Sequence, residues 1–302
     1  MALMEELEGA AAAVVEAAAP AVVRVGGGWG RGNGVVVGAG TVLTNAHNLR
    51  GEETTVTFAD GRSATATLAG VDVDGDLAVL RVDTATVPPV PWRPDDSPVR
   101  PGTPVFALAA PAGGGVRVTF GTVSATGRSF RGPAGRLVSD ALEHTAPLAR
   151  GSSGGPVLDA AGRLVGISTH RLGDGFYLAV SAAAGLRERV ERLARGESPR
   201  RVRLGVAVAP PAAARRLRAA VGLPQRDGLL VRGVEEDSPA HRAGITRGDL
   251  ITEVDGTAVT DVDGLFAALE RAGETVRLKV VRGTDELDLE VGLSGPVTEG
   301  SA

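Results

Sequence analysis

The residues best suited to carry out chemistry begin with a serine in a glycine-rich segment. Ser153 lies within Gly151-Ser-Ser-Gly-Gly-Pro156. A nucleophilic serine needs a tight turn that exposes its hydroxyl, and glycine permits the backbone angles of such a turn. The amides of Gly151 and Ser153 would then form an oxyanion hole, where each donor contributes about 3 to 4 kcal/mol in the transition state. On this hexapeptide alone, a hairpin turn without a catalytic role is an equally good interpretation.

Two further residues have side chains that complement a nucleophilic serine. His47 ends the segment Thr44-Asn-Ala-His47, where its imidazole could act as a general base toward a hydroxyl. Asp76 precedes the apolar run Leu77-Ala-Val-Leu80, where its carboxylate could orient the far ring nitrogen of His47. Alone, each has a structural alternative, as a histidine at a strand end or an aspartate capping a turn. In the order His, Asp, Ser they predict a catalytic triad shared by two barrels.

The composition indicates a β-rich protein of two domains. The chain has 302 residues, of which 43% are hydrophobic, and domains commonly hold about 100 to 200 residues. Valine-rich runs are broken by turns drawn from 43 Gly and 18 Pro, which favours short strands. The net charge of -4 provides no basic field for nucleic acid. With no cysteine, a disulfide framework, a thiolate metal site and a cysteine nucleophile are excluded.

The N-terminal segment does not have the features of an export signal. Met1 to Glu8 is acidic where a signal peptide is basic, and the apolar run Ala10 to Ala19 contains Glu16 and is followed by Pro20. We expect no membrane span in this chain. The expected location is the cytoplasm, or the periplasm or another extracytoplasmic space if an export or anchor segment has been removed.

The expected fold class is mainly β, with two antiparallel barrels followed by a small α+β domain. A run of strands from about residue 21 to 181 predicts the barrels, and a polar segment with Gly and Pro after residue 194 predicts a linker. The expected division is an N-terminal helical segment (1–20), a protease domain (21–185), a linker (186–202), the α+β domain (203–293) and a disordered tail (294–302).

Four ordered motifs resemble those of the HtrA family of DegP-like and DegS-like serine proteases. They are Thr44-Asn-Ala-His47, Asp76-Leu-Ala-Val-Leu80, Gly121-Thr-Val-Ser124 and Gly151-Ser-Ser-Gly-Gly-Pro156, and the similarity runs from about Val14 to Leu293. The resemblance implies chymotrypsin-like barrels, endoproteolysis of unfolded or exposed segments without ATP, protein quality control and homotrimers. It implies no cofactor, metal or nucleotide. It also implies a substrate pocket walled by Ser168, Thr169, His170 and Leu178.

The sequence departs from the family pattern close to the nucleophile. Ser152 stands where relatives usually have Asn, and Ala146-Pro147 follows Thr145 where they have Asp-Ala. The substitution at Ser152 is expected to be mild, whereas Ala146 and Pro147 affect hydrogen bonding in the loop before the nucleophile. A long insertion that some members carry before Asp76 is absent, so cage-forming higher oligomers are not expected.

The C-terminal segment resembles a bacterial PDZ domain. The resemblance rests on Arg203-Leu-Gly-Val-Ala207, Ser238-Pro-Ala-His-Arg-Ala-Gly-Ile245 and Gly248-Asp-Leu-Ile-Thr-Glu-Val-Asp-Gly256. It implies that Leu204, Gly205 and Val206 form a loop whose backbone amides bind a peptide C-terminus while the peptide adds as a strand. The structural alternative is that Gly205 is only a strand bulge.

Two other motifs and three other histidines are weaker candidates. Asp72-Val-Asp-Gly-Asp76 has its glycine at the wrong position for an EF-hand loop. The glycine-rich run Gly26 to Gly34 precedes a strand rather than a helix, unlike a phosphate-binding loop. The remaining histidines are expected in turns or on the surface, namely His144, His170 and His241.

The sequence therefore predicts a serine endopeptidase that acts on unfolded or exposed segments of proteins. Its partners would be unfolded or misfolded polypeptides at the protease domain and peptide C-termini at the PDZ domain. An alternative from a different class is a proteolytically inactive chaperone or PDZ scaffold that binds unfolded chains or C-termini.

Overall fold

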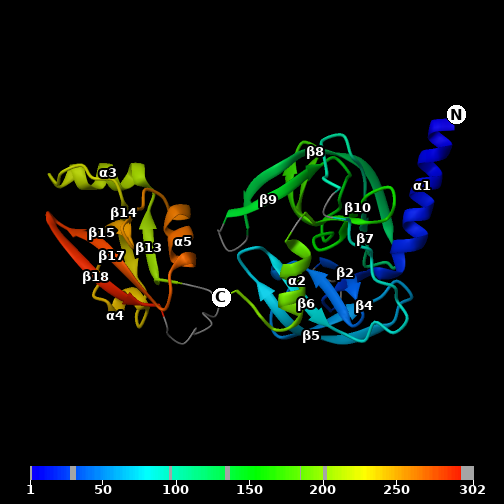
Figure 1. Ribbon diagram of the computed structural model, residues 1–302, viewed down its shortest axis with the longest axis horizontal. Helices are drawn as coiled ribbons and strands as arrows, with labels where there is room; N and C mark the ends of the chain where they lie inside the picture. Colours follow the sequence, from blue (N-terminus) through cyan, green and yellow to red (C-terminus); the bar gives the residue numbers. More distant parts are fainter. Residues whose placement is uncertain are drawn as a thin grey trace. The chain divides into compact units, whose positions relative to one another are not determined.

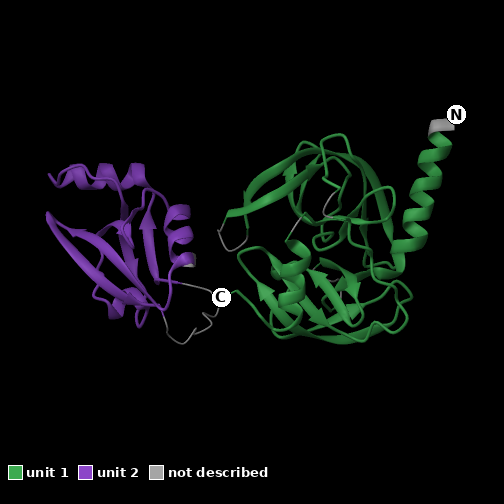
Figure 2. Cartoon of the chain, viewed as in Figure 1, with its two compact units in different colours: residues 1–199 green, residues 200–302 purple. Residues whose placement is uncertain are grey.

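The computed structural model describes residues 2–27, 32–94, 97–132, 137–183, 185–199 and 203–293. The chain forms two compact units, residues 1–199 and 200–302 (Figure 2). The expected disordered tail, 294–302, lies outside the described residues, as do residues 200–202 of the expected linker. Within the described ranges, no helix has the length and apolar character needed to cross a bilayer.

The first unit contains two closed antiparallel barrels (Figure 1). In the first barrel the strand order is β1-β2-β3-β6-β5-β4, and β1 pairs with β4 to close it. In the second the order is β10-β11-β12-β9-β8-β7, and β10 pairs with β7. The first-barrel strands are β1 (Val22–Val25), β2 (Gly32–Gly38), β3 (Thr41–Thr44), β4 (Glu53–Thr57), β5 (Ser63–Asp72) and β6 (Leu77–Arg81). The second-barrel strands are β7 (Pro104–Ala109), β8 (Arg117–Arg131), β9 (Leu137–His144), β10 (Pro156–Leu158), β11 (Leu164–Gly173) and β12 (Phe176–Ser181).

Helix α2 (Leu186–Ala194) belongs to this unit and packs against β5 and β6. Its Leu186, Val190 and Leu193 are buried in the same core cluster as the barrel residues. The helix lies so close to β5 that a Cβ atom on Gly70 would lie 2.4 Å from the Leu193 carbonyl oxygen. The expected linker spanned residues 186–202. The structure instead places α2 on the barrel, because the apolar side of this charged helix covers the outer face of β5 and β6.

The burial of β6 follows from the same packing. Leu77, Ala78, Val79 and Leu80 are consecutive and all buried. A strand with one solvated face alternates between apolar and polar residues, whereas a continuous apolar run indicates burial on both faces. Here the barrel interior covers one face and α2 contributes to the other. The turn that carries Asp76 therefore leads directly into one of the most buried strands of the unit.

An N-terminal helix precedes the first barrel. Helix α1 (Ala2–Ala18) and the short helix η1 (Ala19–Ala21) lead into β1. Val14 and Ala18 are buried in the barrel core cluster, so the end of α1 is packed on the barrel. Pro20 lies in the short helix at the point where the α-helix ends.

The second unit is a mixed α+β domain. Its sheet has the order β13-β14-β15-β17-β18, with β16 paired to β15. The buried carboxylate of Asp249 accepts hydrogen bonds from Arg282 Nε and Nη2, each at 2.8 Å, which ties the start of β15 to the end of β17. The elements are β13 (Val206–Ala209), α3 (Pro211–Ala220), β14 (Leu229–Val234), α4 (Pro239–Arg242), β15 (Leu250–Val254), β16 (Thr257–Ala258), α5 (Val262–Arg271), β17 (Thr275–Arg282) and β18 (Asp285–Gly292).

If α2 is part of the barrel unit, Leu193→Ala should destabilise residues 1–199. Leu193 is fully buried, and truncating such a leucine to alanine costs about 2–5 kcal/mol. Leu172→Ala is the control, since Leu172 is 47% exposed and should change the stability by less than about 0.5 kcal/mol. Urea denaturation measures both effects. Equal midpoints for the two variants would show that α2 does not stabilise the barrels.

Candidate active site

His47 and Asp76 are brought together at one end of the first barrel. His47 lies in the short helix η2 (Ala46–Asn48), directly after β3, and Asp76 lies in the turn before β6 with a positive φ of 53°. His47 Nδ1 is 2.9 Å from both Oδ1 and Oδ2 of Asp76. A carboxylate can only accept, so Nδ1 is the donor and Nε2 is left with its lone pair for a proton.

The Asp76 carboxylate is buried and receives further hydrogen bonds. The backbone amide of His47 donates to Oδ1 at 3.2 Å, and Thr169 Oγ1 donates to Oδ2 at 2.7 Å. Asn45 Nδ2 donates to the Asp76 carbonyl oxygen at 2.9 Å. Thr169 comes from β11 of the second barrel, so the acid is held from both barrels. Thr169 was expected in the pocket wall, but its hydrogen bond to Asp76 was not expected, because no local pattern reveals a contact between the two barrels.

Ser153 lies in a turn that precedes β10. Gly151 and Gly154 on either side of it have positive φ angles of 83° and 88°, which glycine adopts without strain. The hydroxyl of Ser153 donates to the carbonyl oxygen of Thr169 at 3.1 Å. To donate to His47 Nε2, this hydroxyl must rotate away from Thr169. Catalytic hydrogen bonds often tighten only when substrate is bound.

A cavity of about 240 Å³ opens beside Ser153. Ser168, Thr169 and His170 line it, together with the loop residues before Ser153. Leu178, assigned to this wall from the sequence, does not line the cavity and is buried in the barrel core. Its neighbour Tyr177 lines the cavity instead, because successive side chains of a strand point to opposite faces. The other lining residues are Leu148, Ala149, Arg150, Gly151, Ser152, Ser153 and Arg171.

The loop before Ser153 is anchored to β8. The Thr145 amide donates to the Thr122 carbonyl, and the Thr122 amide donates to Thr145 Oγ1, both at 3.0 Å. Ala146 is fully buried, and a Cβ atom on Gly121 would lie 2.2 Å from the Ala146 nitrogen. Gly121 and the small side chain of Ala146 thus allow close contact between the loop and β8.

His144 does not lie in a turn or on the surface, and that expectation was wrong. It is the last residue of β9 and is fully buried. Its ring stacks on Tyr177 with centroids 5.8 Å apart, and neither ring nitrogen has a hydrogen-bond partner among the described residues. Burial lowers the pKa of His144 from 6.5 to about 4, since the apolar surroundings disfavour the charged ring.

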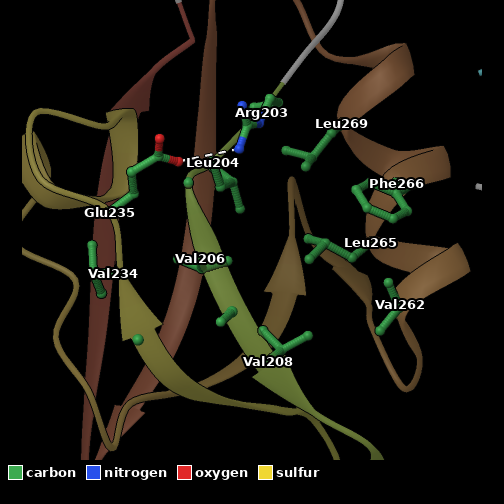
Figure 3. Close-up of a pocket in the computed structure, with 13 residues that line it drawn as sticks. Arg203, Leu204, Val206, Val208, Val234, Glu235, Val262, Leu265, Phe266 and Leu269 are labelled. Atoms are coloured by element: carbon green, nitrogen blue, oxygen red, sulfur yellow. Dashed lines mark hydrogen bonds and ion pairs between the residues drawn. The ribbon is translucent and has the colours of Figure 1, made fainter. Parts of the chain in front are cut away.

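The second unit contains a groove of about 510 Å³ between β13 and α5 (Figure 3). Leu204 and Val206 lie along one side, and side chains of α5 point toward them from the other. Gly205, between them in the chain, also lines the groove. Arg203 and Glu235 form an ion pair of 3.2 Å at one end of the groove. The α5 residues are Val262, Leu265, Phe266 and Leu269.

Gly205 begins the approach to the first strand of this sheet. Its φ is 74°, and a Cβ atom there would lie 2.2 Å from the Ser238 Cβ atom. Its carbonyl accepts from the Glu235 amide at 2.8 Å, and the Leu204 carbonyl accepts from the Ala240 amide at 2.9 Å. Because β13 is an edge strand, its outer side can pair with an added strand.

Within the described part of the chain, no group of three or more His, Cys, Asp or Glu side chains is placed to hold a metal ion. In the acidic segment Asp72 to Asp76, the first carboxylate accepts hydrogen bonds from other groups of the protein. Asp72 Oδ1 accepts from the Gly75 amide at 2.8 Å, and Asp72 Oδ2 accepts from Arg189 Nη1 of α2 at 3.2 Å.

Comparisons with known proteins agree with both units. A trypsin-like peptidase domain family matches residues 32–167, and a PDZ domain family matches residues 230–282. The serine protease HhoA of Synechocystis sp. is 32% identical over 279 residues, covering 87% of this chain and 70% of HhoA. A DegP-like periplasmic serine endoprotease of Brucella suis is 33% identical over 280 residues, covering 86% of this chain and 52% of the relative. This chain therefore spans about half the length of that relative.

Solved structures show the same similarity. The HtrA-type protease AlgW with a decapeptide superposes with a TM-score of 0.70 at 29% identity, covering 94% of this chain and 99% of AlgW. The serine endoprotease from Yersinia pestis gives 0.69 at 28% identity, covering 93% of this chain and 96% of that one.

Fold and site together define a trypsin-like serine endopeptidase followed by a PDZ domain. More particularly, the chain belongs to the HtrA family of serine proteases.

The unpaired ring of His144 should make the first unit lose stability in mild acid. Between pH 6.5 and about 4, the His144 ring is protonated in the unfolded chain but stays neutral in the folded one. The free energy of unfolding therefore falls as the pH falls through this window. His144→Phe keeps the stacking on Tyr177 and removes the proton site. We expect denaturation midpoints that fall less between pH 7 and pH 4.5 than those of the wild type.

His241→Ala, in residues 200–302, is the control and should leave the transition of residues 1–199 unchanged. If His144→Phe and the wild type show the same loss of stability in acid, the buried ring does not account for it.

Proposed function

We propose that Ser153 is the nucleophile of this endopeptidase, His47 its general base and acid, and Asp76 the residue that orients His47. One observation carries the proposal, the double role of Thr169. Its hydroxyl donates to Asp76 at 2.7 Å, and its carbonyl accepts from Ser153 at 3.1 Å. A single residue of β11 thus contacts both the acid and the nucleophile, which come from different barrels.

In the proposed reaction, Ser153 Oγ attacks the carbonyl carbon of the scissile peptide bond while its proton passes to His47 Nε2. The carbonyl electron pair moves to the oxygen, then returns as the C–N bond breaks, and the leaving amine takes the proton from His47. Water then attacks the acyl-enzyme ester with His47 again as base, releasing the acid and restoring Ser153. Asp76 stabilises the imidazolium that forms in each half.

The amides of Gly151 and Ser153 are the proposed oxyanion hole. Neither amide donates a hydrogen bond to a described residue. The neighbouring amides of the turn are engaged, since Ser152 donates to Ala149 at 3.3 Å and Gly154 to Ser168 at 2.7 Å. Two free donors on a turn whose other amides are occupied are suited to bind a developing negative charge.

We further propose that the substrates are unfolded or exposed polypeptide segments with a small or medium aliphatic residue before the scissile bond. The cavity beside Ser153 has apolar walls at Leu148, Ala149 and Tyr177, and none of its described lining residues is a carboxylate that would bind Arg or Lys. A role in protein quality control, assembly as a homotrimer, and a periplasmic location like that named for the DegP-like relative are proposals that rest on the family. No observation favours the inactive chaperone or scaffold.

The groove between β13 and α5 is the proposed site for peptide C-termini. Leu204, Gly205 and Val206 would bring their amides to the terminal carboxylate, and the peptide would pair with the free edge of β13. The apolar α5 side chains would then contact the last side chain of the peptide.

Ser153→Ala should lower kcat on unfolded casein by about 10⁴-fold or more, because triad members act as a unit. Asp76→Asn should cause a loss of about 10⁴-fold through the wrong imidazole tautomer. Ser181→Ala is the matched control at the end of β12 and should retain wild-type activity. Casein cleavage by Ser153→Ala at the wild-type rate would refute the assignment.

Full-length Ser153→Ala protein should bind peptides with hydrophobic ends and a free C-terminus with a Kd of about micromolar, since ordering a flexible peptide opposes binding. Isothermal titration with the same peptide carrying a C-terminal amide should show affinity at least about tenfold lower. Adding Gly205→Ala should also abolish tight binding, because the added Cβ would clash with Ser238. Equal affinity for free and amidated peptides would exclude carboxylate binding.

A further inference from the structure

Asn33 is a buried residue of the first barrel whose side chain contacts the second. It lies in β2 and is 2% exposed. Its Nδ2 donates to the Gly151 carbonyl at 2.7 Å, and its Oδ1 accepts from the Ala110 amide. A carbonyl only accepts and an amide only donates, so these two partners fix the orientation of the Asn33 side chain. The NH2 group of Asn33 therefore binds the turn before β10, and the side-chain oxygen binds the residue after β7.

The backbone of Asn33 extends the contact to the nucleophile. Its amide donates to the Ser153 carbonyl at 2.7 Å. Its own carbonyl accepts from Thr44 Oγ1 at 2.6 Å, which joins β2 to β3 just before the residues that carry His47. A Cβ atom on Gly154 would lie 2.0 Å from the Asn33 carbonyl oxygen, so the turn is pressed directly against β2.

Asn48 makes a second connection, from the residue after His47. It is 1% exposed, and its Nδ2 donates to the Ser153 carbonyl and to Thr44 Oγ1, both at 3.0 Å. Its Oδ1 has no hydrogen-bond partner among the described residues. A buried acceptor without a hydrogen bond lowers the stability of the fold. Asn48 keeps such an unfavourable group at Oδ1 while its Nδ2 donates to the Ser153 carbonyl, which indicates that the side chain serves the contact made by Nδ2.

Together these bonds hold the carbonyls of the nucleophile turn. The Gly151 carbonyl is held by Asn33 and the Ser153 carbonyl by Asn33 and Asn48, while the Ser152 carbonyl accepts from the Gly155 amide at 3.0 Å. A peptide group is planar, so fixing its carbonyl also fixes the direction of its amide. The Ser153 amide is set by the Ser152 carbonyl, and the bonds on either side prevent this peptide from turning.

We propose that Asn33 and Asn48 are positioning residues for catalysis, which hold the nucleophile turn from the first barrel so that the Ser153 amide, whose peptide lies between the held carbonyls of Gly151 and Ser153, stays directed at the substrate oxyanion. The proposal rests on the assignment of Ser153 as nucleophile. Neither side chain would touch the substrate. The geometry of the oxyanion hole would thus depend on the barrel that carries His47 as well as on the turn itself.

The test uses the full chain and a chromogenic peptide amide. Asn33→Asp keeps the shape and the Oδ1 acceptor but replaces the donor to Gly151 with a second acceptor. Asn48→Ala removes the side-chain donor to Ser153. Loss of one oxyanion donor lowers kcat by about 10²- to 10³-fold, so we expect losses of at least about 30-fold in kcat with KM changed less than about threefold. Affinity for a peptidyl boronate, which mimics the tetrahedral intermediate, should fall in parallel with kcat.

Thr84→Val is the matched control. Thr84 is a buried polar residue of the same unit whose hydroxyl accepts from the Gly40 amide at 3.0 Å, away from the nucleophile turn. It should lower thermal stability while leaving kcat within about twofold. Rates are expressed per active site, counted by fluorophosphonate labelling of Ser153, so that partial misfolding does not mimic the effect. Should Asn33→Asp give no labelled protein, Asn48→Ala decides the outcome by the same criteria.

Wild-type kcat in both variants, or an equal loss in Thr84→Val, would overturn the positioning role. A rise in KM without a fall in kcat would also overturn it, because the residues would then affect substrate binding alone. These outcomes are distinct from failure of the nucleophile assignment, which would appear as activity in Ser153→Ala.

Discussion

The burial of the Asp76 carboxylate between two barrels is the constraint on which the active site depends. A buried carboxylate is very unfavourable unless donors surround it, and here they come from the His47 amide and ring in the first barrel and from Thr169 in the second. The acid therefore has its full set of partners only when both barrels are folded and in contact. The same contact brings Ser153 to Thr169, so the bonds that satisfy the acid also locate the proposed nucleophile.

Close approach of backbones makes this contact possible. Asn33 reaches across the junction because Gly154 has no side chain in the way, and α2 lies on β5 because Gly70 has none. Side chains at these points would force the segments apart by ångströms, since backbone atoms already occupy the positions of the missing Cβ atoms. Several glycines of this chain thus serve contact between distant segments, beyond their usual use in turns.

The two proposed sites use a common physical device in separate units. At Gly151 and at Gly205 the backbone adopts positive φ, and adjacent amides are offered to a negatively charged oxygen. In the first site the negative charge on the oxygen develops during the reaction, and in the second the oxygen belongs to the carboxylate of a peptide C-terminus. Main-chain donors suit both tasks because they are fixed by the fold and make no demand on the sequence of the bound peptide.

The sequence by itself determined the fold class, the run of strands from about residue 21 to 181, and the candidates His47, Asp76 and Ser153, because turn glycines, apolar runs and short motifs are local signals. It gave no indication of Asn33 and Asn48, misplaced His144, and chose Leu178 where Tyr177 lines the cavity. It also left α2 in a linker. Only the tertiary structure decided these points, because each depends on which face of a strand or helix meets a segment distant in sequence. A hydrogen bond between the two barrels produces no pattern in the sequence of either strand that could have predicted it.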